Sequence, residues 1–143
     1  MDWTIDTWVL YKVAEARQEA CRFLERVRLC MHGVGFDLEG QIVAEYRRCL
    51  EVTRSREVKL WFKVAVSKLA IPVSGGLDPE HQEALKNLEF HNDDWPFVGV
   101  ASRTQDKRLV SEESDYKAEV RTFLGRELSV SVLSVAESLA FFT

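Results

Sequence analysis

The residues with the clearest potential for chemistry are four separated carboxylates. Asp6 and Glu113 each follow a short apolar run, and Asp94 begins an apolar pattern with helical spacing. Glu45 falls on the inner side of another helical pattern, where an unpaired charge costs several kcal/mol or a large pKa shift. Carboxylates about 4 Å apart repel by roughly 4 kcal/mol per pair at an effective dielectric near 20. If these side chains meet, a bound cation is expected.

Strand and helix patterns alternate along the chain and predict how these acids are positioned. Strands are predicted at residues 3–6, 70–73, 109–110 and 128–133. Helical patterns cover residues 8–31, 38–52, 54–69, 79–90 and 95–104, followed by a helix after residue 115 and a short last helix. The alternation predicts a three-layer α/β/α domain with a central parallel sheet. Strand ends and helix starts share one edge of such a sheet, so Asp6, Asp94 and Glu113 are expected to converge there.

Several local signals set the predicted boundaries of these elements. Gly33 and Gly35 are expected to end the first long helical pattern, and Asp37 to cap the helix that follows. Gly125 is expected to end the helix after residue 115. Asp78 followed by proline predicts a helix start, and Ser134 with a glutamate three residues later predicts a capping box.

The predicted ligands are oxygen atoms only. Magnesium and manganese prefer such donors, whereas zinc is more often held by histidine or thiolate. The sequence therefore favours Mg²⁺ or Mn²⁺, which can lower the pKa of an attacking water and neutralise charge on a phosphodiester. Simpler alternatives remain open: Asp94 as a plain helix cap, Glu45 as an arginine-paired helix residue, and residues 112–115 as a solvated loop.

Composition bounds the class of protein. The chain has 143 residues, 46% of them hydrophobic, which is expected of one globular domain over residues 1–143. It has no run of about 18 apolar residues and no basic-then-apolar leader, which predicts a soluble cytoplasmic protein that is not exported and has no membrane partner. Cys21, Cys30 and Cys49 have no CxxC spacing, and we expect buried thiols in a reducing compartment.

Four segments together resemble one known family. They read IDTWVL at residues 5–10, IVAEYRRCL at 42–50, DWPFVGVA at 94–101 and RLVSEESDY at 108–116. In this order and spacing the chain resembles the PIN-domain superfamily of metal-dependent nucleases, mostly ribonucleases, which includes the VapC-type toxins of toxin–antitoxin pairs. The resemblance implies an RNA substrate, an antitoxin protein as a possible partner, and a homodimer.

The resemblance also implies roles for particular residues. The acidic catalytic residues would be Asp6, Glu45, Asp94 and Glu113. Metal would be held by Asp6, Asp94 and Glu113, with Asp115 as a further ligand. Hydroxyl groups expected to support the cluster by hydrogen bonds are those of Thr7 and Ser111.

Two positions depart from the family pattern. Trp8 replaces a small or amide residue, and it could narrow the site or stack on a base. Glu113 is one methylene longer than the usual aspartate, so either the metal geometry shifts or Asp115 does that work. These departures leave a second hypothesis beside the active ribonuclease: a binding module for RNA or protein whose catalytic site has decayed. The third hypothesis is a structural domain without metal, which requires that the acids lie far apart in the fold.

The charge pattern bears on the substrate. The net charge is −4, and the surface is balanced once the four proposed site acids are set aside. Residues 47–68 include seven basic residues but only two acidic ones, Glu51 and Glu57. This stretch is either a solvated helix face or a phosphate-contacting rim that includes Arg47 and Arg48. Weak overall basicity argues against tight nonspecific nucleic-acid binding.

Overall fold

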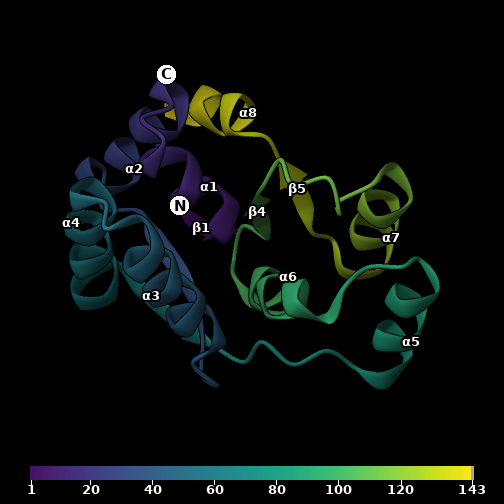
Figure 1. Cartoon of the computed structure of the whole chain (residues 1–143). Coiled ribbons are helices and arrows are strands. Elements are labelled where there is room, and N and C mark those ends of the chain that lie inside the picture. Colours follow the sequence, from purple (N-terminus) through teal and green to yellow (C-terminus); the bar gives the residue numbers. More distant parts are fainter. Residues whose placement is uncertain (143) are drawn as a thin grey trace.

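A computed structural model describes residues 1–142, and its centre is a five-stranded parallel sheet (Figure 1). The strands are β1 (Asp2–Ile5), β2 (Gly33–Asp37), β3 (Ala70–Val73), β4 (Arg108–Val110) and β5 (Ser131–Leu133). Their order across the sheet is β3-β2-β1-β4-β5, and every neighbouring pair is parallel. The predicted parallel sheet is confirmed, with the N-terminal strand in its middle.

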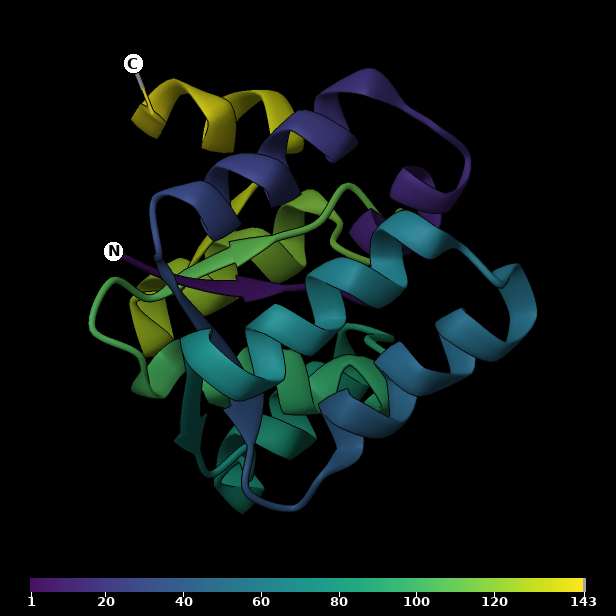
Figure 2. The same ribbon diagram turned by 90° about the vertical axis from the view of Figure 1, so that its left-hand side faces the viewer.

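Helices cover both faces of this sheet. They are α1 (Thr7–Ala14), α2 (Gln18–Leu29), α3 (Gln41–Thr53), α4 (Arg56–Val64), α5 (Pro79–Asn87), α6 (Trp95–Arg103), α7 (Ala118–Leu128) and α8 (Val135–Leu139). A π-helical turn, Ala65–Leu69, extends α4, and short 3-10 helices span Asn92–Asp94 and Ala140–Phe142. Helices α1 to α4 and α8 pack together on one face, whereas α6 packs on β1, β2 and β4 from the other, beside α5 and α7 (Figures 1 and 2). The three-layer α/β/α class predicted from the sequence is therefore confirmed.

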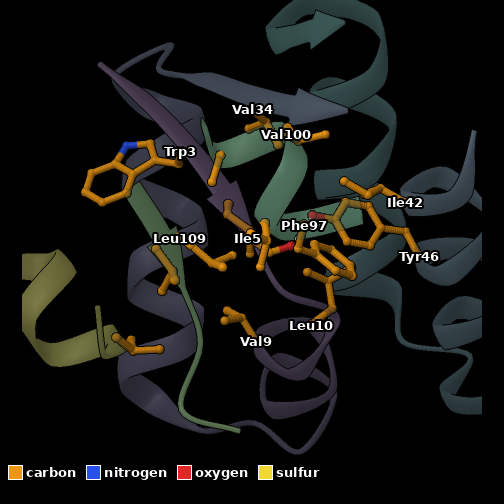
Figure 3. Close-up of a cluster of buried hydrophobic side chains, with 14 of the residues drawn as sticks. Trp3, Ile5, Val9, Leu10, Val34, Ile42, Tyr46, Phe97, Val100 and Leu109 are labelled. Carbon is orange, nitrogen blue, oxygen red and sulfur yellow. Dashed lines mark hydrogen bonds between the residues drawn. The ribbon is translucent and has the colours of Figure 1, made fainter. Parts of the chain in front are cut away.

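Strand β1 is buried on both faces. Trp3, Thr4 and Ile5 have no exposed surface, as expected for the central strand of a sheet covered by helices on both sides. Figure 3 shows Ile5 among core side chains from α1, α3, α6 and β4. The hydroxyl group of Tyr46 on α3 donates a hydrogen bond to the backbone carbonyl of Ile5. This bond ties α3 to the carboxyl end of β1.

The first long helical pattern was predicted incorrectly in two ways. The helix divides into α1 and α2 around Ala16, whose φ of 60° is incompatible with a continuous helix. Gly33 and Gly35 do not end a helix; they lie in β2, which the sequence pattern missed. A Cβ on Gly35 would lie 2.5 Å from Val100 Cγ1, so glycine is required there by the close packing of α6 on the sheet.

Two other predicted boundaries also shift. Asp37 still caps α3, but across a loop: its carboxylate accepts the N–H groups of Gln41 (2.8 Å) and Ile42 (2.7 Å). Gly125 lies inside α7, which instead ends at Leu128 and is capped by Ser129 with a φ of 57°. The predicted starts of α5 at Asp78 and of α8 in a capping box are confirmed.

None of the helices within residues 1–142 has the length and apolar character needed to cross a bilayer.

Candidate metal centre

Three carboxylates from different parts of the chain meet at the carboxyl edge of the sheet. Asp6 joins β1 to α1, Asp94 precedes α6, and Glu113 follows β4. One carboxylate oxygen of each lies within 4.8 Å of the other two. Asp6 and Asp94 are only 2% and 8% exposed, and Glu113 is half-buried. The predicted convergence is present, which removes the hypothesis of dispersed acids.

Asp6 is held in place by both neighbouring elements. Its backbone N–H donates to the carbonyl of Val110 (3.0 Å), which continues the pairing of β1 with β4. Its carboxylate accepts the N–H of Trp8 (3.4 Å) at the start of α1. The hydroxyl of Ser111 also donates to it (2.9 Å), and the N–H of Glu113 donates to that hydroxyl oxygen (3.1 Å). The predicted supporting hydrogen bond from Ser111 is therefore confirmed, whereas the one predicted from Thr7 is wrong, because the buried Thr7 hydroxyl has no hydrogen-bond partner within residues 1–142.

Asp94 lies at the head of α6, after the 3-10 turn that begins at Asn92. Pro96 is tolerated in the first turn of the helix because the N–H groups there lack intrahelical partners. The Asp94 carboxylate accepts no capping hydrogen bond from the helix. The alternative that Asp94 is a plain helix cap is therefore not what the structure shows.

Burial raises the pKa of all three acids, and repulsion between the charges adds to the shift of Asp94 and Glu113. Burial, followed by the charges of Asp6 and Glu113, raises the pKa of Asp94 to about 8. Burial and then the charge of Asp6 raise the pKa of Glu113 to about 7. Burial also raises the pKa of Asp6, although the hydrogen bond from Ser111 opposes that change. Near neutral pH the cluster therefore needs protons or a cation to be stable.

The surrounding groups fit a hard divalent ion. The converging donors are all carboxylate oxygens, which suit Mg²⁺ or Mn²⁺. Among the buried hydroxyls without a hydrogen-bond partner within residues 1–142 are Thr7 Oγ1 and the phenol of Tyr116. Burial raises the pKa of Tyr116 well above its usual value, and the charges of the nearby acids, Asp6 and Asp94 among them, raise it further. Both hydroxyls are free to bond to an ion's ligands or to its bound water.

The acids open into a pocket of about 520 Å³. Trp8, Glu45 and Asp115 line it, as do Tyr11 and Lys12. Asp115 is outside the group of three converging oxygens, although its charge and side chain raise the pKa of Glu113. Its role as a ligand stays a prediction, as do the metal roles of the three converging acids.

Three predicted site residues, Glu45, Arg47 and Arg48, lie on α3 and are outside the group of three converging acids. Glu45 forms an ion pair with Arg48 (3.1 Å), as in the alternative of an arginine-paired helix residue, but it also lines the acidic pocket. Arg48 lines an adjoining pocket with Glu45. Arg47 is exposed and borders neither pocket. Contact of either arginine with a substrate stays a prediction.

Tyr11, Lys12 and Tyr116 are among the residues in or near the acidic pocket that were not singled out in the sequence. Tyr11 and Lys12 follow Thr7 and Trp8 by four positions, which places them on the same side of α1. That spacing was a usable signal once α1 was assigned. Tyr116 gave no signal, because nothing in the sequence shows that its hydroxyl lacks a partner in the fold.

The chain was compared with known proteins: no protein-family model matches it, and neither a curated protein nor a solved structure matches it significantly. Its class is therefore defined by fold and site alone. It is an α/β/α protein whose parallel sheet carries a cluster of three acids, able to hold a metal ion, at the carboxyl ends of its strands.

Proposed function

We propose that this protein is an Mg²⁺- or Mn²⁺-dependent endoribonuclease of the PIN-domain type. The observation that carries the proposal is the convergence of Asp6, Asp94 and Glu113 within 4.8 Å at the edge of a parallel sheet where ligands bind. The four-segment resemblance to PIN-domain nucleases supplies the reaction class, the hydrolysis of RNA phosphodiesters.

In this proposal the three converging carboxylates hold the ion, and Ser111 orients Asp6 through its hydrogen bond. The ion, when bound, would lower the pKa of a water molecule and offset the charge of the phosphodiester. We assign proton acceptance from that water to Glu45, since it lines the pocket but is not one of the three converging acids.

Cleavage of total RNA with and without Mn²⁺ tests the proposal. The wild-type protein should cut RNA only with the metal, and Asp6→Asn and Asp94→Asn should each lose at least about 100-fold in rate, the upper end of what even outer-shell partners of a metal contribute. The matched control is Asp78→Asn, which makes the same change at an exposed acid at the head of α5. Equal cleavage by Asp94→Asn and wild type would refute the proposal.

Calorimetric titration with Mn²⁺ separates this function from the alternative of a decayed binding module. An active site should give saturable heat that Asp6→Asn abolishes. A decayed site should give none, whereas RNA binding would persist. The antitoxin partner, the homodimer and the cytoplasmic location rest on the resemblance and the composition alone.

A further inference from the structure

A second pocket adjoins the acidic one. It also measures about 520 Å³, and the two pockets share the side chains of Trp8 and Lys12. Its remaining lining comes from the start of α2, including Arg17, from Glu112, and from the start of α8. Trp8 and Lys12 therefore form the boundary between the acids and a separate cavity large enough for a small ligand.

The boundary is a fixed aromatic and cationic pair. Trp8 and Lys12 are one helical turn apart on α1, and the Lys12 ammonium lies 5.2 Å from the centroid of the Trp8 ring. Lys12 is also held by an ion pair with Glu15 (3.0 Å). Asp6 caps the same helix. One rigid element thus sets the position of the aromatic ring relative to the proposed metal site.

The second pocket has a further cation available for a ligand. Arg17 is exposed and forms no ion pair with any residue in 1–142. The two acids that line the same pocket, Glu112 and Glu19, compete only in part with a ligand for the charge of Arg17. Glu112 accepts the backbone N–H of Val135 (3.1 Å) at the head of α8, and Glu19 is exposed to solvent. The pocket therefore offers an aromatic face and two cations.

We propose that this second pocket is a nucleotide subsite for single-stranded RNA, in which Trp8 stacks on a base and Lys12 and Arg17 contact the neighbouring phosphate. The inference deepens the proposed function and rests on it for the identity of the ligand. An aromatic side chain stacks on bases of any sequence, but only where the base is not already paired and stacked in a duplex. The base that occupies this subsite is therefore unpaired.

Another pocket adjoins the acidic one on the side of α3 and α6. A pocket of about 320 Å³ shares Glu45, Asp93 and Phe97 with it. Cavities thus extend from the acids in two directions, one past Trp8 and one past Phe97. This arrangement suits a strand that passes through the site, and so cleavage inside the chain of RNA and not only at its end.

Binding measurements test the subsite without relying on cleavage. The background is Asp94→Asn, which keeps the RNA intact, and the probe is a short fluorescent single-stranded RNA observed by anisotropy. Trp8→Leu keeps apolar packing but removes the aromatic face, and it should weaken binding about tenfold. Trp8→Phe keeps an aromatic face and should bind within about threefold of the background protein.

The cations are tested by salt dependence. Lys12→Met and Arg17→Ala should each lower the slope of log affinity against log salt by about 0.7, the value for one phosphate contact on a single strand. Lys86→Ala on α5 and Arg126→Ala on α7 are matched controls, both exposed and outside these pockets, and should leave the slope unchanged. Duplex RNA of the same sequence should bind more weakly than the single strand.

Equal affinities of the Trp8→Leu and Trp8→Phe proteins would overturn the subsite, as would equal binding of duplex and single strand. Failure of the subsite is distinguishable from failure of the nuclease proposal. If Mn²⁺-dependent cleavage persists while Trp8 has no effect on binding, only the subsite is refuted. If Trp8-dependent binding is present but no metal-dependent cleavage occurs, the subsite stands and the nuclease proposal does not.

Discussion

Replacing Asp94 with asparagine should stabilise the metal-free protein at alkaline pH while it removes the proposed activity. The pKa of Asp94 is about 8 in the folded protein, against an ordinary value of 3.8. Between these pH values the folded state holds a proton that the unfolded state has released. The contribution of Asp94 to stability is therefore highest below about pH 4. It falls by about 1.4 kcal/mol per pH unit until the pH passes the folded pKa.

The magnitude follows from that interval. The wild-type protein loses at most about 5 kcal/mol from this group between pH 4 and pH 8. Asparagine has no charge, but its buried amide still costs roughly 1–3 kcal/mol to desolvate. We therefore expect Asp94→Asn to gain about 2 kcal/mol at pH 8, or roughly 6 °C in melting temperature for a chain of this size. At pH 5 the wild type has lost only about 1.7 kcal/mol from this group, less than the roughly 3 kcal/mol that the buried amide costs, so Asp94→Asn should melt about 4 °C below the wild type.

Thermal melts in EDTA at pH 5 and pH 8 measure both values. Asp78→Asn is the matched control, because its carboxylate is exposed (78%) and outside the cluster, and it should melt like the wild type at both pH values. Added Mn²⁺ should raise the melting temperature of the wild type but not of Asp94→Asn, since a ligand stabilises only the state that binds it. If Asp94→Asn melts at or below the wild type at pH 8, the raised pKa of Asp94, and with it the effect of burial and repulsion on this group, is wrong.

Three further changes have defined outcomes. Gly99→Ala should destabilise the fold by about 2 kcal/mol in urea denaturation, because the new Cβ would lie 2.0 Å from the backbone oxygen of Gly75; an unchanged midpoint would contradict this packing. Tyr46→Phe should cost about 1–2 kcal/mol in the same assay, since it leaves the buried carbonyl at the end of β1 without its hydroxyl donor; a loss below about 0.3 kcal/mol would show that the bond contributes little. Ser111→Ala removes the 2.9 Å hydrogen bond to the Asp6 carboxylate and should weaken Mn²⁺ binding about tenfold by calorimetry, with unaltered affinity as the contrary result.

The layered class and the meeting of the acids could be predicted because they depend on regular features. Strand-length apolar runs alternate with helical patterns, and parallel strands place their carboxyl ends along one edge. Asp6 and Glu113 follow such strands directly, so their convergence required no knowledge of side-chain packing.

The missed elements depend on tertiary contacts that a local pattern does not contain. Gly33 and Gly35 resemble a helix end, but they are glycines because Ile71 and Val100 pack against the backbone of β2. The break between α1 and α2 at Ala16 contains neither glycine nor proline, so local propensity favours a continuous helix. The second pocket also escaped prediction, since Glu112 and the start of α8, which complete its lining, are far from α1 and α2 in sequence.

The central place of β1 has a consequence for the order in which the molecule is assembled during translation. One edge of β1 pairs with β2 early, but its other edge waits for β4, which is encoded far downstream. A nascent chain that has emerged only as far as α6 contains Asp6 and Asp94, yet it lacks both the strand that fixes Asp6 and the acid that follows it. The acidic centre therefore forms only after β4 and Glu113 have been synthesised, and a chain that stops before β4 cannot assemble it.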